Sequence, residues 1–587
     1  MKPVMKRRAV NSAIREAALA AGYSELQANI LGARLPESAA VDIRAHVSPT
    51  LRMLDAPDRL PDIAIAAERI ADFVMDESQR AIIISDHDVD GISGHSVLRT
   101  ALIEYFGVNH HRLGGVLSHK RREGFGVSDA LLERMIQQYP PPALCITVDQ
   151  GSQDNERFKK MQALGYVTIC TDHHHVDEPP SAAIACVNPS RHDSEFADAS
   201  ICGAHVAWLV ACAVRRVLIK RGVLAGDSPN LAPLLDIVSS AVVADAVNVA
   251  ASKNNRAVIN YGLTRMNANA RPVWVAMRNI LHKEGPLTAQ DLGMGIGPRI
   301  NALSRMGDAL PGVQLMRAPD VQKAMELAAF ADSENQQRKQ IESQMLDQAV
   351  VIARGQAEAG RHATCVYLAD GTSGVGGIVA SRLVDAFGRP SVCLSPKFGQ
   401  PGMLTGSLRS IPGINIIQAL TAAKEADSEC CLFFGGHKAA GGVSLLEEHL
   451  ERFNDAFNAA VGTQRDLSKA TPIYFSDGPL NQTPSEQVMD EIEALAPYGR
   501  EFELPQFEGE FAVGNVRAVG DGTHLKLSLI DATGQAHDAI WFRAKKVDDP
   551  DPVMPGNWVR ALYSLSANHF RGTRRIDIQI KHVSLNS

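Results

Sequence analysis

The sequence predicts an α/β protein: a parallel-sheet lobe and a smaller α/β lobe joined by a long helix, plus a C-terminal all-β barrel. Three observations carry this prediction. Short apolar runs alternate with helical patterns between residues 81 and 189, a helical pattern without proline begins at Val321, and short alternating strands follow Thr471. The length of 587 residues fits about three to five domains of roughly 100–200 residues each.

The composition excludes several classes of protein. With 45% hydrophobic and 21% charged residues, the chain is neither wholly disordered nor a coiled coil or collagen-like fibre. No apolar run reaches the roughly 18 residues of a membrane span, and the basic N-terminus lacks the apolar core of a secretory signal. We therefore expect no membrane association and a cytoplasmic location. The net charge of −7 argues against coating nucleic acid through bulk charge, but it leaves room for a local basic groove.

The cysteines favour a reducing compartment and not a zinc site. There are nine, an odd number, and no CxxC pair occurs. Most lie among Val, Ile, Leu and Ala, so we expect them to be reduced core residues.

The first part of the chain is expected to hold an N-terminal helical segment (1–60) and the parallel-sheet lobe (61–320). Strands are predicted at 81–86, 143–150, 165–172 and 182–189, with helices at 93–107, 199–221 and 234–247. Strand–helix alternation at this spacing is typical of a parallel sheet covered by helices on both faces.

The second part divides into three. The helical pattern is longer than most globular helices, so we interpret 321–358 as a strut between two lobes. A second α/β lobe is expected over 359–470, and five short strands with turn signals indicate a small antiparallel barrel over 471–587.

The strongest chemical signal is the segment SDHDVDG, residues 85–91, directly after the first strand. Asp86, Asp88 and Asp90 alternate at the carboxyl end of that strand, the edge where parallel α/β sheets bind ligands. Such close carboxylates repel one another by several kcal/mol unless a cation neutralises them. The segment therefore indicates a divalent-cation site; the alternative is a solvated acidic loop.

Two more strands end in the same way. Asp149 closes one strand, and Asp172 closes the next and is followed by three histidines, His173 to His175. Each Asp alone would suit a helix cap or a turn. Together they would meet at one sheet edge, and Asp245, inside an apolar run, would need a partner if buried. Asp and His ligands without Cys suit Mn²⁺ or Mg²⁺, and the number of carboxylates favours two metals.

These residues resemble a known family. SDHDVDG, VDQG, TDHHH and VADAV, in that order, resemble motifs I to IV of the DHH phosphoesterase superfamily. GIGPRINALSRMGDA (295–309), GVGGIVASRLVDAFGRP (374–390), GSLRSIPG (406–413) and GGHKAAGG (435–442) resemble the RecJ family of single-strand-specific exonucleases. The resemblance implies a DHH lobe, a DHHA1 lobe and an OB-fold barrel, in that order.

It also implies roles for individual residues. The metal ligands would be Asp88, Asp90, Asp149, His173 and Asp245. Catalytic groups would be Asp86, at the same cluster, His174, near the attacking or leaving group, and Arg299, facing the phosphate. Substrate-binding groups would be Asn301, Lys120, Ser407, Arg409, Ser410 and His437. As a lone motif the glycine cluster around His437 would equally suit a tight turn, and GPRINALSR would suit a plain loop and helix start.

The activity implied is 5′→3′ hydrolysis of single-stranded DNA to 5′-mononucleotides in recombination and repair, with two divalent cations, Mn²⁺ before Mg²⁺. Single-stranded DNA is the expected partner, and a single-strand-binding protein or a helicase stays open. Two alternatives remain: a DHH-family phosphodiesterase of short oligonucleotides or cyclic dinucleotides, and a non-catalytic single-strand-binding module. The barrel argues against the first and the complete acid set against the second.

The barrel carries basic residues interleaved with aromatic ones, a mixture that suits backbone contact and base stacking. The alternative is solvated barrel faces around core aromatics. The residues are Lys526, Arg543, Lys545, Lys546, Arg560, Arg571, Arg574 and Arg575, with Trp541, Phe542, Tyr563 and Phe570.

The sequence also departs from the family pattern. Ser85 and His87 replace a glycine and an aromatic residue, Gly371-Thr372 replaces a Trp-His pair, and Lys120 aligns with an arginine. The metal-site acids are unchanged, so we expect hydrolysis to persist. The missing His leaves the rate, the metal preference and the end recognition open.

Overall fold

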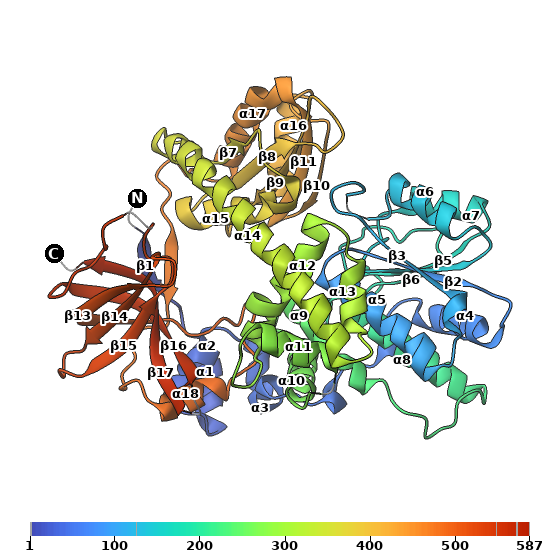
Figure 1. Ribbon diagram of the computed structural model, residues 1–587, viewed down its shortest axis with the longest axis horizontal. Coiled ribbons are helices and arrows are strands. Elements are labelled where there is room, and N and C mark those ends of the chain that lie inside the picture. The colour runs from blue at the N-terminus through green and yellow to red at the C-terminus, as the bar shows by residue number, and fades with distance from the viewer. Residues whose placement is uncertain (1–2, 125, 270, 547–548, 571–572, 586–587) are drawn as a thin grey trace.

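The structure is a computed structural model that describes residues 3–124, 126–269, 271–546, 549–570 and 573–585 (Figure 1). The sheet of the parallel-sheet lobe has the strand order β3-β2-β4-β5-β6, with every neighbouring pair parallel. Its strands are β2 (Ala81–Ser85), β3 (Leu113–Leu117), β4 (Leu144–Val148), β5 (Val167–Thr171) and β6 (Ala185–Val187). The order reverses direction between β2 and β4, which opens a crevice at their carboxyl ends.

Alternate residues of these strands enter two different cores, as the period of two in a strand requires. Ile83 and Ile146 pack with α4, α5 and α8, while Ile82 and Cys145 pack with α6 and α7 on the opposite face. The helices of this lobe are α4 (Ile63–Met75), α5 (Val89–Thr100), α6 (Asp129–Gln138), α7 (Asn155–Ala163), α8 (Gly203–Lys220), α9 (Leu235–Ala244), α10 (Lys253–Asn267), α11 (Pro272–Ile280), α12 (Gly297–Met306) and α13 (Leu310–Met316). This confirms the predicted parallel sheet with helices on both faces.

The predicted long helix is α14 (Val321–Glu358), which runs from the parallel-sheet lobe up to the second lobe (Figure 1). The second lobe is a five-stranded sheet of order β10-β11-β9-β8-β7 in which only β7 and β8 are parallel. Its elements are β7 (Thr364–Tyr367), α15 (Ser373–Phe387), β8 (Ser391–Pro396), β9 (Met403–Arg409), α16 (Ile416–Ala426), β10 (Phe433–His437), β11 (Ala440–Leu446) and α17 (Leu450–Gln464). The glycine-rich segment around His437 is thus a β-hairpin joining β10 and β11.

The C-terminal barrel is closed, with strand order β13-β14-β15-β17-β16. Its strands are β13 (Phe507–Val519), β14 (His524–Ile530), β15 (Ala536–Trp541), β16 (Trp558–Phe570) and β17 (Thr573–Leu585). These five strands are those predicted from the alternating pattern. No helix among the described residues has both the length and the hydropathy needed to cross a bilayer.

The N-terminal segment differs from the helical prediction at its start. A strand, β1 (Val4–Arg7), precedes the helices α1 (Ser12–Ala20), α2 (Glu25–Gly32) and α3 (Ile43–Val47). It pairs in parallel with β12 (Ile473–Ser476), just ahead of α18 (Glu486–Glu493) and the barrel. The segment therefore lies between the parallel-sheet lobe and the barrel (Figure 1).

Two buried arginines hold this junction together. Arg34 of the N-terminal segment forms two hydrogen bonds with the Asp477 carboxylate, at 2.7 and 2.8 Å. Arg256 of α10 is fully buried and donates to the carbonyl oxygens of Val47 and Leu495, from the N-terminal segment and the segment before the barrel.

Candidate metal centre and phosphate site

Acidic side chains converge at the carboxyl ends of β2, β4 and β5. Asp88 caps α5, because its Oδ1 accepts from the backbone N–H groups of Asp90 (2.9 Å) and Gly91 (3.2 Å). Asp149 follows β4 with a left-handed backbone, φ +60°. The tight turn after β2 needs glycine, since a Cβ on Gly91 would lie 2.3 Å from the Asp86 carbonyl oxygen.

The imidazole of His173 lies at the centre of this cluster. Its Nε2 is 3.2 Å from Asp149 Oδ1, 3.6 Å from Asp90 Oδ2 and 3.7 Å from Asp245 Oδ2. A second group of oxygens, from Asp86, Asp88 and Asp149, lies within 4.8 Å of one another. The structure therefore brings together all five predicted metal ligands and Asp86.

The cluster is arranged to hold cations. Asp149 Oδ1 and His173 Nε2 are buried and have no hydrogen-bond partner among the described residues. Burial and the neighbouring carboxylates raise the pKa values of Asp149 and Asp245 well above the usual range, and that of Asp88 as well. Crowded carboxylates beside an imidazole are stabilised by divalent cations bound to oxygen and imidazole ligands.

Asp90 is fixed by the start of another helix. Its two carboxylate oxygens accept from the backbone N–H groups of Gly203 (2.7 Å) and Ala204 (2.8 Å) in the first turn of α8. A Cβ on Gly203 would lie 2.7 Å from Asp149 Cβ, so glycine allows the close approach of α8 to the cluster. The helix dipole favours the negative charge of Asp90 at that point.

Two histidine–carboxylate pairs adjoin the cluster. His174 Nδ1 lies 2.7 Å from Asp172 Oδ1; burial opposes its protonation, but the Asp172 charge prevails and raises the pKa of His174 to about 10. Asp172 also accepts from the backbone N–H of Ser152, so it positions His174 and is not itself among the candidate ligands. Asp86 is buried, yet the charge and hydrogen bond of His87, together with the Ser118 hydroxyl at 2.8 Å, lower its pKa to about 2.

Cationic side chains from both lobes face the acids. Burial and the charge of Arg305 lower the pKa of Lys120 to about 7, while Asp86 and Asp88 act in the opposite direction and Arg409 adds to the repulsion. Arg305 and Arg409 are themselves desolvated, which lowers both their pKa values. Burial, followed by the charges of Arg409 and His174, lowers the pKa of His437. The β10–β11 hairpin therefore lies near these two residues. Desolvated cations beside a metal cluster suit a phosphate group.

Three residues predicted as catalytic or substrate-binding, Arg299, Asn301 and Ser410, make their side-chain contacts with other parts of the protein. Arg299 donates to Asp332 of α14 at 2.8 Å and to the Gly295 carbonyl, so its guanidinium supports the junction of α12 with α14. The side-chain oxygen Oδ1 of Asn301 accepts from Val89 N–H at 3.1 Å, which holds α12 against the start of α5. Ser410 donates to the Ile414 carbonyl oxygen within its own loop.

Ser407 and Arg409 point from β9 toward the start of α15. A Cβ on Gly377 would lie 3.0 Å from Arg409 Nη2 and 3.7 Å from Ser407 Cβ. Arg305 was not predicted, although it stands four residues after Asn301 in the same motif and therefore on the same face of α12. That spacing is the signal that could have identified it.

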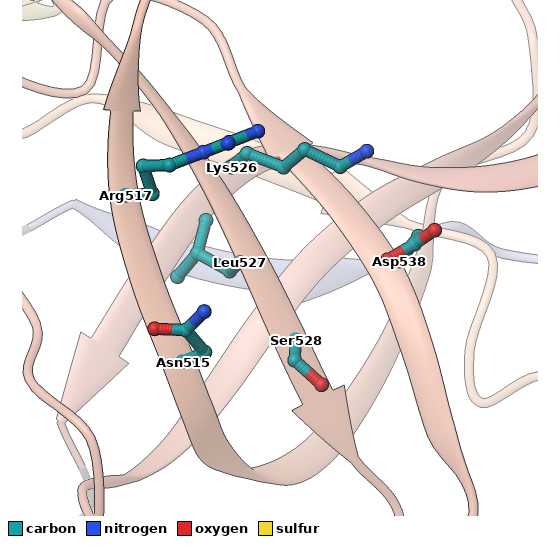
Figure 2. A pocket seen from close by; sticks show the side chains of 6 residues that line it. All are labelled: Asn515, Arg517, Lys526, Leu527, Ser528 and Asp538. Carbon is teal, nitrogen blue, oxygen red and sulfur yellow. The ribbon is translucent and has the colours of Figure 1, made fainter.

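The barrel has a polar hollow of about 180 Å³ across β13, β14 and β15 (Figure 2). Arg517 and Lys526 are cross-strand neighbours at one end of it, and Asn515 and Ser528 line the other. Most other predicted basic residues here are engaged with acids. Lys545 pairs with Asp551, Lys546 with Asp347 of α14, Arg560 with Glu508, and Arg574 with Asp490 and Glu493.

The predicted aromatic residues of the barrel divide between core and surface. Tyr563 is buried and Phe542 is half exposed. Arg571 and the Phe570 side chain lie outside the described residues. Of the predicted basic residues, Lys526 thus lines the hollow together with Arg517, which the sequence did not single out.

Comparison with protein families agrees with the three-part architecture. Residues 80–242 match the DHH family, N-terminal domain, residues 361–463 match the DHHA1 domain, and residues 477–582 match the RecJ OB domain. The fold and the acid cluster thus define a DHH-type protein with an added barrel.

Whole-chain comparisons narrow the class. The single-stranded-DNA-specific exonuclease RecJ of Dickeya dadantii (strain 3937) is 32% identical over 86% of this chain and 88% of its own length. The protein of the same name from Haemophilus influenzae is 30% identical over 91% and 92%. The chain belongs to the RecJ family.

Solved structures share the fold. RecJ in complex with Mn²⁺ from Thermus thermophilus superimposes with a TM-score of 0.77 at 23% identity, covering 100% of this chain and 80% of that one. A structure of exonuclease RecJ bound to manganese gives a TM-score of 0.58 at 25% identity, covering 70% of this chain and 97% of that one.

Proposed function

We propose that this chain is a metal-dependent exonuclease that hydrolyses single-stranded DNA from its 5′ end and releases 5′-mononucleotides. The observation that carries the proposal is a crowded acid cluster in which the buried Asp149 Oδ1 and His173 Nε2 have no hydrogen-bond partner among the described residues. Lys120, Arg305 and Arg409 lie beside it. Family membership supports the same activity, since curated relatives are single-stranded-DNA-specific exonucleases.

Two divalent cations, Mn²⁺ before Mg²⁺, are the cofactors we propose. The ligands would be Asp88, Asp90, Asp149, His173 and Asp245, with Asp86 held ready beside them by Ser118. Cations at this cluster supply Lewis-acid activation of a phosphodiester. RecJ structures with bound Mn²⁺ or Mg²⁺ support this choice of metals.

The remaining groups of the chain bind and orient the strand end. Arg409, Lys120 and Arg305 would hold the terminal 5′-phosphate through charge-assisted hydrogen bonds, with Ser407 and His437 as neutral donors. His174 keeps its Nδ1 on Asp172, which leaves Nε2 to give a proton to the leaving 3′-oxygen. We propose that Arg299, Asn301 and Ser410 act by positioning this machinery, because their side-chain contacts are with the protein.

The test uses long single-stranded DNA labelled at either end, incubated with Mn²⁺. Mononucleotide from the 5′ label should appear at once, and Asp149→Asn should slow its release by about 100-fold or more, since a metal ligand is lost. Asp177→Asn is the matched control, because that carboxylate is almost fully exposed and lies only four residues from His173. Cleavage of only very short oligonucleotides, or tight binding without turnover, would refute the proposal in favour of a small-substrate phosphodiesterase or a binding module.

We further propose a setting in recombination and repair in the cytoplasm, on strands exposed by a helicase or covered by a single-strand-binding protein. All nine cysteines are free, as a reducing compartment requires. We propose that the chain divides into an N-terminal segment, a DHH domain, a connecting helix, a DHHA1 domain and an OB-fold domain, with the boundaries 1–60, 61–320, 321–358, 359–470 and 471–587.

A further inference from the structure

A second cavity lies away from the metal centre, against the edge strand β3. Its volume is about 730 Å³, within the range of small-molecule sites. It lies between β3, α5, α13 and the first turns of α14, elements that adjoin one another in Figure 1. Its walls combine the polar side chains of His95, Arg99, Arg317 and Lys323 with those of Leu113, Tyr139 and Val313.

The cavity carries positive charge without an acidic residue among its lining. Arg99 donates to the Leu113 carbonyl at 3.1 Å and has no carboxylate partner among the described residues. Arg317 and Lys323 contact Glu104 and Glu326, whose side chains are more than half exposed and do not line the cavity. Each of these arginines therefore retains hydrogen-bonding capacity toward an anion in the cavity.

The charges in the cavity repel one another in the absence of an anion. Burial, together with the charges of Arg99 and Arg317, lowers the pKa of His95 to about 3. Burial and then the charge of Arg317 lower the pKa of Arg99. An anion between the two guanidinium groups would relieve this repulsion.

We propose that this cavity binds a phosphate monoester with an apolar body, of the mononucleotide class. The dianionic phosphate matches the cations Arg99, Arg317 and Lys323, and Tyr139, Leu113 and Val313 offer a surface for a base or sugar. The choice of a mononucleotide rests on the proposed function, because that is the product such an exonuclease releases.

The cavity is separate from the metal centre but mechanically joined to it. Arg99 stands nine residues after Asp90 on α5, which places it about 14 Å further along the helix axis. The His95 ring on the same helix lies 3.0 Å from the hydroxyl of Ser85, the residue just before Asp86. The cavity and the metal centre therefore lie along one helix, α5, which Asp88 caps and which carries Asp90.

Binding of dAMP to the full chain, measured by calorimetry in chelator without metal, tests the site. Because dAMP is also the proposed product, two sites are expected in the wild-type protein. Lys323→Glu should remove one, or weaken it at least 10-fold, and Arg409→Gln should remove the other. Lys159→Glu is the matched control, since Lys159 and Lys323 are equally exposed and both pair with a glutamate three residues away.

The outcomes separate this inference from the proposed function. Loss of one dAMP site in Lys323→Glu and in Arg99→Gln, but not in Lys159→Glu, supports the cavity site even if the chain shows no nuclease activity. Unchanged number and affinity of dAMP sites in both variants would overturn it. If inorganic phosphate binds as tightly as dAMP, the apolar walls do not contact a base or sugar as proposed. If deoxyadenosine binds as tightly as dAMP, the cations do not bind the phosphate as proposed.

Discussion

Replacing Arg256 by methionine should weaken the contact between the barrel and the parallel-sheet lobe. The guanidinium is fully buried, donates to Val47 O at 3.0 and 2.8 Å and to Leu495 O at 2.8 Å, and lies 4.6 Å from the Phe502 ring. Methionine fills similar space and donates no hydrogen bond. The two carbonyl groups would then be left buried without this donor.

The magnitude follows from those contacts. Each buried carbonyl left unsatisfied costs about 1–3 kcal/mol, so two cost about 2–6 kcal/mol. Loss of the contact between cation and ring adds up to about 2 kcal/mol. Burying the Arg256 charge is itself costly, because its described partners include no carboxylate. Removing that charge therefore offsets part of the lost stability. We expect a net loss of about 2–5 kcal/mol, confined to the junction.

Hydrogen exchange followed by mass spectrometry is the suitable assay, because a chain with several domains need not unfold in one step. Amides near residues 43–54 and 492–502 should exchange faster in Arg256→Met, while the strands around Ile83 stay protected. Arg256→Lys should lie between the two, and Arg265→Met, on the same helix, should match the wild type. Equal protection of the junction in Arg256→Met and wild type would refute this account of the contact.

Three further results are expected. Gly203→Ala should weaken Mn²⁺ binding about 10–100-fold by calorimetry, since the new methyl would displace Asp149, whereas Gly355→Ala, in open space on α14, should not. Mn²⁺ at 100 times its Kd should stabilise the protein by about 2.7 kcal/mol, which raises the unfolding midpoint. In Asp149→Asn the midpoint should not rise with Mn²⁺. Burial and the nearby arginines keep His95 neutral in the folded state, so its contribution to stability is present above pH 6.5 and falls by about 2 kcal/mol by pH 5. Denaturant unfolding should therefore show a smaller loss of unfolding free energy between pH 6.5 and pH 5 in His95→Gln than in the wild type.

Each of these has a result that would contradict it. Normal Mn²⁺ affinity in Gly203→Ala would mean that α8 can move away from Asp149. A midpoint unchanged by Mn²⁺ would mean that the acid cluster binds no cation in the folded chain. Parallel acid destabilisation of wild type and His95→Gln would mean that other groups dominate the pH dependence.

Local patterns predicted most of the fold. The barrel strands follow from the alternation of apolar and polar residues, and four strands of the parallel-sheet lobe follow from short apolar runs. The strand β3 was missed because Gly114 and Gly115 interrupt its apolar character. The strand β1 was missed because its four residues pair with Ile473–Ser476, a contact that no local window contains.

The site divides in the same way. Asp86, Asp149 and Asp172 follow strands directly, so the sheet topology brings them together and the sequence reveals them. The pairing of Arg299 with Asp332 depends on how α12 packs on α14, and the convergence of Lys120 with Arg409 depends on how two lobes meet. Such contacts between elements distant in the chain leave no periodic signal.

The pairing of β1 with β12 also constrains the order of folding during synthesis. The two strands are about 470 residues apart. At about 5–20 residues per second, a ribosome needs roughly 25–90 seconds to make that interval. Throughout that time the backbone edge of β1 has no partner strand, so the nascent chain offers it to chaperones or to other chains before the barrel exists.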